Sequence, residues 1–237
     1  MASDLAKKYN TYLLFTMPEV DGGKYYETAI LFDFNGKQAG IYRKSHLNDE
    51  EKSWASAGNS LPIFNTDILG RVAVILNDEV RIPELADVYG LNRADLILIP
   101  TDYDGKQYGS EVNIPKGLVP DASNRGMNFW YDIAKYSQAY TLVANYQQSS
   151  DKEYVRSAVY SLVPEVGYYP PNIAPHKEVA HQSIFTTHVN NTLFMNQHEM
   201  VVGRRYDLAM PLTLDMQGDC FKEWQANSTS KLVCKGQ

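Results

Sequence analysis

The order of its elements predicts that this chain is an α/β protein built from packed layers. Strand and helix patterns alternate through the first half, and strands pair with one another in the middle. The run Asp95–Pro100 is almost continuously apolar, which is typical of a strand buried on both faces of a sheet. Together these features favour mixed α/β layers over a purely doubly wound sheet.

The local signals place the elements in order. Residues 3–10 indicate the end of a helix, residues 12–17 an apolar strand, and residues 18–23 a turn with two glycines. Asn35-Gly36 is a strong hairpin signal between two strands, at 26–34 and 37–44. The later expected elements are a strand pair at 61–66 and 71–76, a helix at 83–89, a strand at 95–100, a helix at 128–138, and strands at 140–145, 157–163 and 183–189.

Composition narrows the class of protein. A length of 237 residues suits one large domain, and a net charge of −6 without charge clusters argues against a nucleic-acid or anionic-membrane surface. No apolar run approaches the length of a membrane span, and the first residues lack the apolar core of a signal peptide. We therefore expect a cytoplasmic protein. Cys220, Cys234 and glycosylation sequons at Asn190 and Asn227 leave export, and a disulfide between the two cysteines, open.

The sequence predicts no cofactor and no metal. Four of the histidines lie in the last third of the chain, and their spacing fits no common zinc pattern. These are His176, His181, His188 and His198.

A strand, a polar turn and a helix start follow one another from Arg71 to Glu84. This stretch resembles the nucleophile elbow of the nitrilase (carbon–nitrogen hydrolase) superfamily, whose pattern is Cys-Tyr-Asp-x-Arg-Phe-Pro-Glu. Arg81-Ile-Pro-Glu84 matches the end of that pattern, and Asn77 stands where the family has its cysteine. An amide side chain is not a useful nucleophile, so the resemblance implies a site without the usual covalent catalysis.

A second stretch strengthens the resemblance. Tyr42-Arg-Lys44-Ser-His46-Leu47 is similar to the family's Tyr-Arg-Lys-x-His-Leu, whose lysine stabilises the oxyanion. The resemblance thus gives Lys44 the oxyanion position and makes Glu51 a possible supporting glutamate. Later matches at 94–101, 140–145 and 203–208 extend it over residues 5 to 210, which predicts a nitrilase-like domain at 1–210 and a tail at 211–237.

The resemblance implies a four-layer αββα sandwich in which the first β-α-β portion is missing. In the family that portion carries the base glutamate, so its absence would remove a second catalytic group. It would also expose a sheet edge, which needs cover, and we therefore expect a homodimer, or a chain or segment that completes the fold. Asp78, Tyr103 and Trp130 are expected to contact a small amide-like ligand.

Three functions remain open at this point. The favoured one is a nitrilase-like module without hydrolytic activity that binds a small molecule or a partner. The second is an amidase, nitrilase or N-acyltransferase that a missing segment completes, in which Asn77 is a natural variant or an engineered change. The third is a purely structural dimerisation domain. The loops at 102–124 and 164–183 contain no readable code for a substrate.

Overall fold

The computed structural model describes residues 1–102, 133–134, 136–145 and 158–160. The chain divides into two units, Met1–Val201 and Val202–Gln237, and the second lies wholly outside the described residues. Tyr103, Trp130, Cys220 and Cys234 also lie outside them. The expected ligand contacts of Tyr103 and Trp130, the cysteine pairing and the domain boundary at 210 therefore stay predictions.

The first sheet contains three antiparallel strands that follow a short helix, α1 (Ala2–Lys8). The strands are β1 (Leu13–Asp21), β2 (Lys24–Phe32) and β3 (Gln38–Arg43), in the order β1-β2-β3. The turn expected at 18–23 is confined to its two glycines, Gly22 and Gly23, and its expected start is wrong, because β1 continues through Pro18 and pairs with β2 as far as Asp21. In the described sheet β1 is an edge strand, where a proline without an N–H group is tolerated.

The expected hairpin at Asn35-Gly36 is present between β2 and β3. Gly36 has a φ of 77°, and the Asp33 carboxylate accepts hydrogen bonds from the backbone N–H groups of Asn35 and Lys37. The strand register places Thr28 opposite Arg43. Fixing this register decides which side chains of β2 meet those of β3.

The second sheet is mixed, with the order β4-β5-β6-β7-β8. Its strands β5, β6 and β7 are parallel, and the two outer strands are antiparallel to their neighbours. A 3₁₀ helix, η2 (Asn77–Arg81), and the helix α2 (Pro83–Leu91) connect β5 to β6. The strands are β4 (Phe64–Thr66), β5 (Gly70–Val74), β6 (Leu96–Thr101), β7 (Tyr140–Asn145) and β8 (Ala158–Tyr160).

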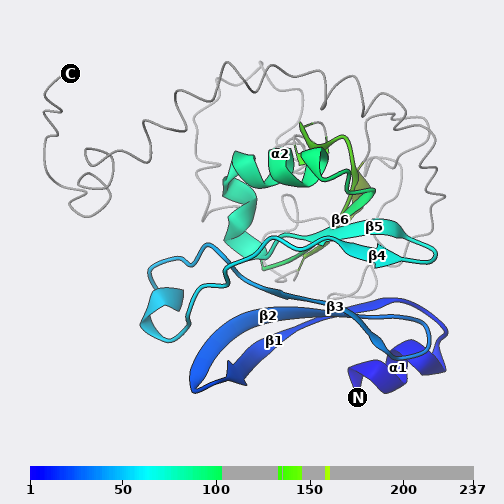
Figure 1. The fold of residues 1–237 in the computed structure, drawn as a ribbon, viewed down its shortest axis with the longest axis horizontal. Coiled ribbons are helices and arrows are strands. Elements are labelled where there is room, and N and C mark those ends of the chain that lie inside the picture. The colour runs from blue at the N-terminus through cyan, green and yellow to red at the C-terminus, as the bar shows by residue number, and fades with distance from the viewer. Residues whose placement is uncertain (103–132, 135, 146–157, 161–237) are drawn as a thin grey trace, which may run out of the picture. The chain divides into compact units, whose positions relative to one another are not determined.

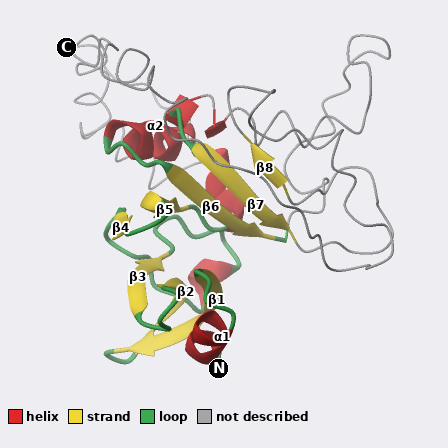
Figure 2. Ribbon diagram, turned by 90° about the vertical axis from the view of Figure 1, so that its right-hand side faces the viewer, coloured by secondary structure: helices red, strands yellow, loops and turns green. Residues whose placement is uncertain are grey.

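The two sheets and α2 form successive layers (Figures 1 and 2). Alternate residues of β5 explain this, because Val72 and Val74 pack against the first sheet whereas Ala73 packs with α2. Leu31 and Tyr42 supply the facing surface of the first sheet. The central strands are therefore buried on both faces, and the expected mixed α/β layering is confirmed.

Close contact between the layers depends on Gly40 in β3. A Cβ atom at this position would lie 2.3 Å from the ring of Phe64 in β4. A glycine lets the two backbones approach there.

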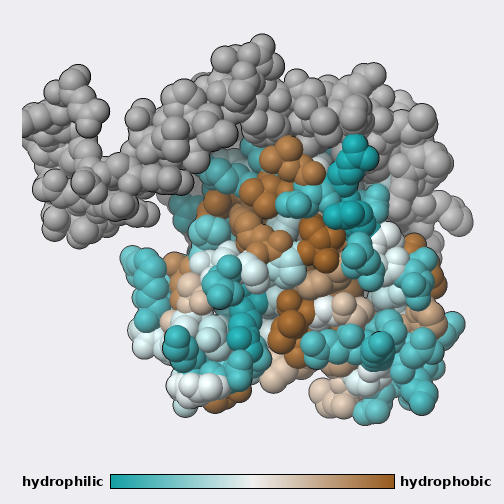
Figure 3. Space-filling model, viewed as in Figure 1, coloured by the Kyte–Doolittle hydropathy of each residue, from teal (hydrophilic) through white to brown (hydrophobic). Residues whose placement is uncertain are grey.

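The surface of the described residues has both polar and apolar regions. Hydrophobic residues gather around α2 and between the two sheets, and hydrophilic residues dominate at the level of the first sheet (Figure 3). Among the described helices, none combines the length and the apolar character that crossing a membrane requires.

Candidate functional site

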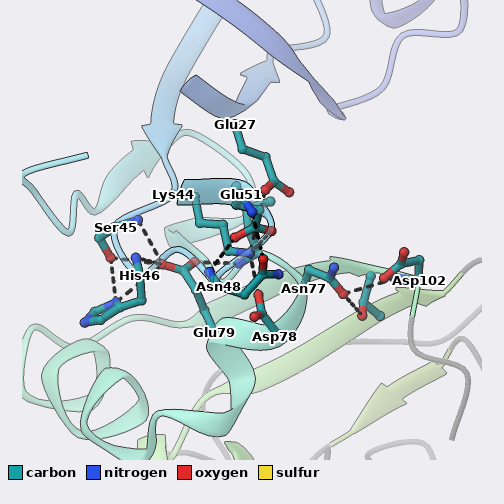
Figure 4. Close-up of polar contacts among 12 residues, drawn as sticks. Glu27, Lys44, Ser45, His46, Asn48, Glu51, Asn77, Asp78, Glu79 and Asp102 are labelled. Carbon is teal, nitrogen blue, oxygen red and sulfur yellow. Dashed lines mark hydrogen bonds and ion pairs between the residues drawn. The ribbon is translucent and has the colours of Figure 1, made fainter. Parts of the chain in front are cut away.

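The centre of the site is the side chain of Lys44, which follows β3 and is fully buried. Its Nζ donates hydrogen bonds to the carboxylates of Glu51 and Asp78 (Figure 4). The carboxylate of Glu27 lies 3.6 Å from the same nitrogen. One ammonium group therefore stands among three carboxylates, and these four side chains form the Lys44 cluster.

Each acid of the Lys44 cluster comes from a different element. Glu27 lies in β2, and its carbonyl accepts a 2.8 Å hydrogen bond from the Lys44 N–H group, so the two residues are neighbours across the hairpin. Glu51 begins the 3₁₀ helix η1 (Glu51–Ser53). There its carboxylate accepts a 2.9 Å bond from the N–H group of Asn48, whose side chain accepts one from the Glu51 N–H group. Asp78 lies in η2, directly after the turn that follows β5.

The cluster holds its lysine charged. Burial by itself lowers the pKa of Lys44, but the hydrogen bonds to Asp78 and Glu51 and the charge of Glu27 outweigh it and raise the pKa above 10.5. The opposite happens at Glu27. Burial raises its pKa from 4.5 to about 7, opposed by the charge of Lys44 and supported by a hydrogen bond with Glu51 and by the charges of Glu51 and Asp78.

Glu79 joins the end of β3 to the turn after β5. Its Oε1 accepts hydrogen bonds from the Tyr42 hydroxyl at 2.7 Å, the Ser45 N–H at 2.9 Å and the His46 N–H at 3.0 Å. Its Oε2 accepts a 3.0 Å bond from the N–H group of Leu76, as the third residue of a capping box does. Burial and the charge of Glu79 raise the pKa of Tyr42, which stays a neutral donor. Glu79 therefore fixes the two segments that carry Lys44 and Asp78.

Asn77 occupies a sharp turn between β5 and the rest of η2. Its φ of 48° is in the left-handed region, which asparagine tolerates better than most residues. Its Oδ1 accepts a 3.0 Å hydrogen bond from the hydroxyl of Thr101 at the end of β6. The turn thus presents an amide, held in a defined orientation, beside the Lys44 cluster (Figure 4).

A cavity of about 670 Å³ borders the cluster. Glu27, Glu51 and Asn77 line it, whereas Lys44 and Asp78 are not among its lining residues. The described residues that line it are Thr16, Met17, Pro18, Glu27, Asn48, Asp49, Glu50, Glu51, Trp54, Asn77 and Asp102. A second cavity, of about 560 Å³, is lined mainly by aliphatic side chains, and its described lining contains no carboxylate or lysine. The first is therefore the candidate site for chemistry.

The arrangement can bind and polarise a small polar molecule. It offers carboxyl and amide groups and the side chain of Trp54, which is 41% exposed, on the cavity wall. Among the described residues, neither a cysteine nor a serine lines the cavity. Within the described part of the chain, histidine, cysteine and acidic side chains form no grouping of three or more suited to holding a metal.

The structure brings four of the residues singled out from the sequence into one place: Lys44, Glu51, Asn77 and Asp78. Asp78 is turned toward Lys44 and does not line the cavity. Glu27 was not predicted from the sequence. A signal existed, because a hairpin centred on Asn35-Gly36 would pair residue 27 with residue 44, and beyond an irregularity at Leu31/Phe32 the strands have this register.

Comparison with known proteins gives one family. The family model described as "Carbon-nitrogen hydrolase" matches residues 2–128 of this chain. A Schizosaccharomyces pombe protein named "Probable nitrilase" is 33% identical over 105 residues, 43% of this chain and 38% of that protein. An omega-amidase of Danio rerio is 34% identical over 108 residues, 41% of this chain and 39% of that one. The match spans about two fifths of the length of these curated relatives.

Solved structures support the fold. A carbon–nitrogen hydrolase from Helicobacter pylori superposes with a TM-score of 0.64 at 18% sequence identity, over 89% of this chain and 74% of that one. An amidase of Nesterenkonia from the nitrilase superfamily gives a TM-score of 0.61 at 18% identity, over 89% and 71% of the two chains. The α/β fold of this chain is therefore nitrilase-like.

Proposed function

Because this chain belongs to the carbon–nitrogen hydrolase family, we propose that it is a binding module that keeps the lysine of the family's site but does not hydrolyse its ligand. Asn77 takes the nucleophile position in this proposal, and Lys44 the oxyanion position. One observation carries it: an intact, buried Lys44 cluster borders a cavity to which the adjoining turn contributes an amide.

The chemistry of the amide explains the expected inactivity. Acyl transfer in this manner needs an atom that attacks a carbonyl and a charge that stabilises the resulting oxyanion. Lys44 provides the charge. The nitrogen of the Asn77 side chain is a poor nucleophile because its lone pair is delocalised into the carbonyl, and the Oδ1 atom is engaged with Thr101.

The cavity supports the binding part of the proposal. Its volume, about 670 Å³, is in the range of small-molecule sites, which lies at roughly 300–1,000 Å³. The wall carries the side chains of Asn48, Asn77, Glu27 and Glu51, and amide and carboxyl groups of this kind form hydrogen bonds with a carboxamide. A small amide-like ligand is the class that these groups fit.

Binding can be tested by the melting temperature of the purified chain in a panel of small primary amides and nitriles. We expect at least one amide to raise the melting temperature in a saturable manner, since a ligand that binds only the folded state stabilises it. The same amide should have a smaller effect on Asn77→Leu, which removes the amide from the wall. A panel without any saturable rise would contradict the binding module and favour a purely structural domain.

We further propose the finer features of the fold and assembly: a four-layer αββα sandwich, in a homodimer or completed by another chain or segment. Two observations support this. In the described sheet β1 lies at an edge, and it exposes Phe15, Met17 and Val20. Light scattering over a range of protein concentrations tests the homodimer, and a constant monomer mass would contradict it.

A second function, an amidase or nitrilase-type hydrolase completed by a missing segment, has one observation in its favour. Glu27 supplies a carboxyl group on the cavity wall, 3.6 Å from Lys44. If the machinery around the turn is otherwise competent, Asn77→Cys should form an acyl-enzyme with an activated amide or ester, visible as a mass increase. An unchanged mass, with or without an added N-terminal segment, would count against this function.

A further inference from the structure

The Lys44 cluster has more acids than it has positive charge. Glu27, Glu51 and Asp78 face one ammonium group, so full ionisation would leave a net charge of −2. The side chains of these acids are 24%, 10% and 16% exposed, and that of Lys44 is fully buried. Excess charge in such a place is costly, and it is relieved when an acid takes up a proton.

Geometry selects the acid that takes the proton. Glu51 and Asp78 accept hydrogen bonds directly from Lys44, and Glu51 accepts another from the backbone of Asn48. Both acids therefore share the positive charge of Lys44 directly. Glu27 lies farther from the ammonium nitrogen, at 3.6 Å. A proton on Glu27 thus sacrifices the least contact with Lys44, and it gives Glu27 a hydrogen to donate to the Glu51 carboxylate, an interaction that is among the causes of the raised pKa of Glu27.

The surroundings of Glu27 also favour its protonated form. Three further acids, Asp49, Glu50 and Asp102, line the cavity that Glu27 faces, and none of the described lining residues is a lysine or an arginine. Lys52 compensates Asp49 at 2.8 Å, and this pairing lowers the pKa of Asp49. The lining thus adds negative potential, which favours the protonated form of a carboxyl group. Burial, as described above, brings the pKa of Glu27 to about 7.

We propose that Glu27 is the proton-exchanging group of this cavity: it takes up the proton that relieves the excess negative charge of the Lys44 cluster, and it exchanges that proton with the occupant of the cavity. Of the three acids, Glu27 combines contact with the cavity and the weakest contact with Lys44. For the ligand this inference rests on the proposed function. The protonated state of Glu27 itself needs no ligand.

The protonation state of Glu27 should affect ligand binding. A protonated Glu27 donates a hydrogen bond to the carbonyl oxygen of an amide, whereas an ionised Glu27 repels that oxygen. Affinity for a neutral amide should therefore fall as pH rises through about 7. The expected loss between pH 6 and pH 9 is about tenfold, which corresponds to one hydrogen bond.

Infrared difference spectroscopy of the ligand-free, full-length chain tests the inference directly. The carbonyl band of a protonated carboxylic acid should disappear as pH rises through about 7. The same band, with the same pH dependence, should be seen in Glu19→Gln. This variant is a matched control because Glu19 lies on the neighbouring strand and pairs with Arg43. The band should be absent from Glu27→Gln. A band that survives in Glu27→Gln would place the proton on Glu51 or Asp78 and overturn the inference.

A second measurement needs no variant, which matters if Glu27→Gln folds poorly. In wild-type protein with ¹³C-labelled glutamate, one side-chain carboxyl signal should titrate near pH 7. If every glutamate signal titrates below about pH 5.5, in the range of ordinary carboxyls, the inference is wrong. Both titrations are made without ligand, so their failure leaves the binding module standing. Failure of every amide to raise the melting temperature would in turn leave Glu27 as the proton carrier.

Discussion

Replacing Lys44 by methionine removes the positive charge that the three carboxylates share. Methionine keeps most of the aliphatic packing, because Lys44 is fully buried and its chain has a similar length. The change therefore isolates the ammonium group. What remains is Glu27, Glu51 and Asp78 with no compensating charge from position 44.

The size of the effect follows from these contacts. Removing one partner of a buried ion pair costs about 3–5 kcal/mol, because the other partner is left as an uncompensated charge. We expect a loss in this range at pH 8, which lies above the raised pKa of Glu27. The loss should shrink by about 1–2 kcal/mol at pH 5, since Glu27 is then protonated and the cluster carries one negative charge fewer. Because the pKa of Lys44 is raised in the folded protein, the stability that its charge contributes to wild-type protein is fully present at both pH 5 and pH 8. This contribution is lost only as pH rises above 10.5 and through the higher folded-state pKa.

Urea unfolding at pH 5 and pH 8 measures both quantities. Lys52→Met is the matched control, because the Lys52 side chain is 61% exposed and pairs with Asp49, which is 99% exposed. Its cost should stay below about 1 kcal/mol. A loss below about 1 kcal/mol for Lys44→Met, or the same loss at both pH values, would refute the claim that Lys44 compensates buried carboxylates.

Three further changes test the surroundings of the site. Glu79→Gln should lower the free energy of unfolding in urea by about 2–4 kcal/mol, because an amide group cannot accept all of the hydrogen bonds that both carboxylate oxygens accept. The control Glu84→Gln, at an exposed position, should lower it by less than about 0.5 kcal/mol. Equal effects would disprove the bridging role of Glu79. The stability of Glu27→Gln relative to wild type should increase by about 1–2 kcal/mol between pH 5 and pH 8, since the raised pKa of Glu27 makes the wild-type protein lose stability as pH rises from 4.5 to 7. A stability difference that does not change with pH would contradict that pKa. Gly40→Ala should lower the free energy of unfolding by about 1–3 kcal/mol, because the added Cβ meets the Phe64 ring. Adding Phe64→Leu should recover part of this loss in the double variant. Fully additive effects of the two substitutions would rule out that contact.

Local signals predicted most of the described fold. The apolar run of β6 and the Asn35-Gly36 turn identified their elements because burial and turn geometry act within a few residues. The extension of β1 through Pro18 was missed, because a proline signals a turn locally and only the place of the strand in the sheet makes it acceptable. The packing of two sheets face to face depends on contacts distant in sequence, and it came from the family resemblance.

The site was predictable where it lies in recognisable stretches. Lys44 and Asn77 were found in this way, and the structure places Glu51 and Asp78 against Lys44. Glu27 was missed because its role depends on the register of a hairpin, and a carboxylate on a strand is in most cases simply solvated. Burial and charge excess, which set its pKa, are properties of the folded chain.

Ammonia release by the purified 237-residue chain, over a panel of amides and nitriles, tests the central claim most directly. Wild-type protein and Lys44→Ala should both release no ammonia above the buffer, because a stabilising charge without a nucleophile does not cleave a carbon–nitrogen bond. Release by wild-type protein that disappears in Lys44→Ala would contradict the account, since it would show that this site hydrolyses its ligand with Asn77 in place.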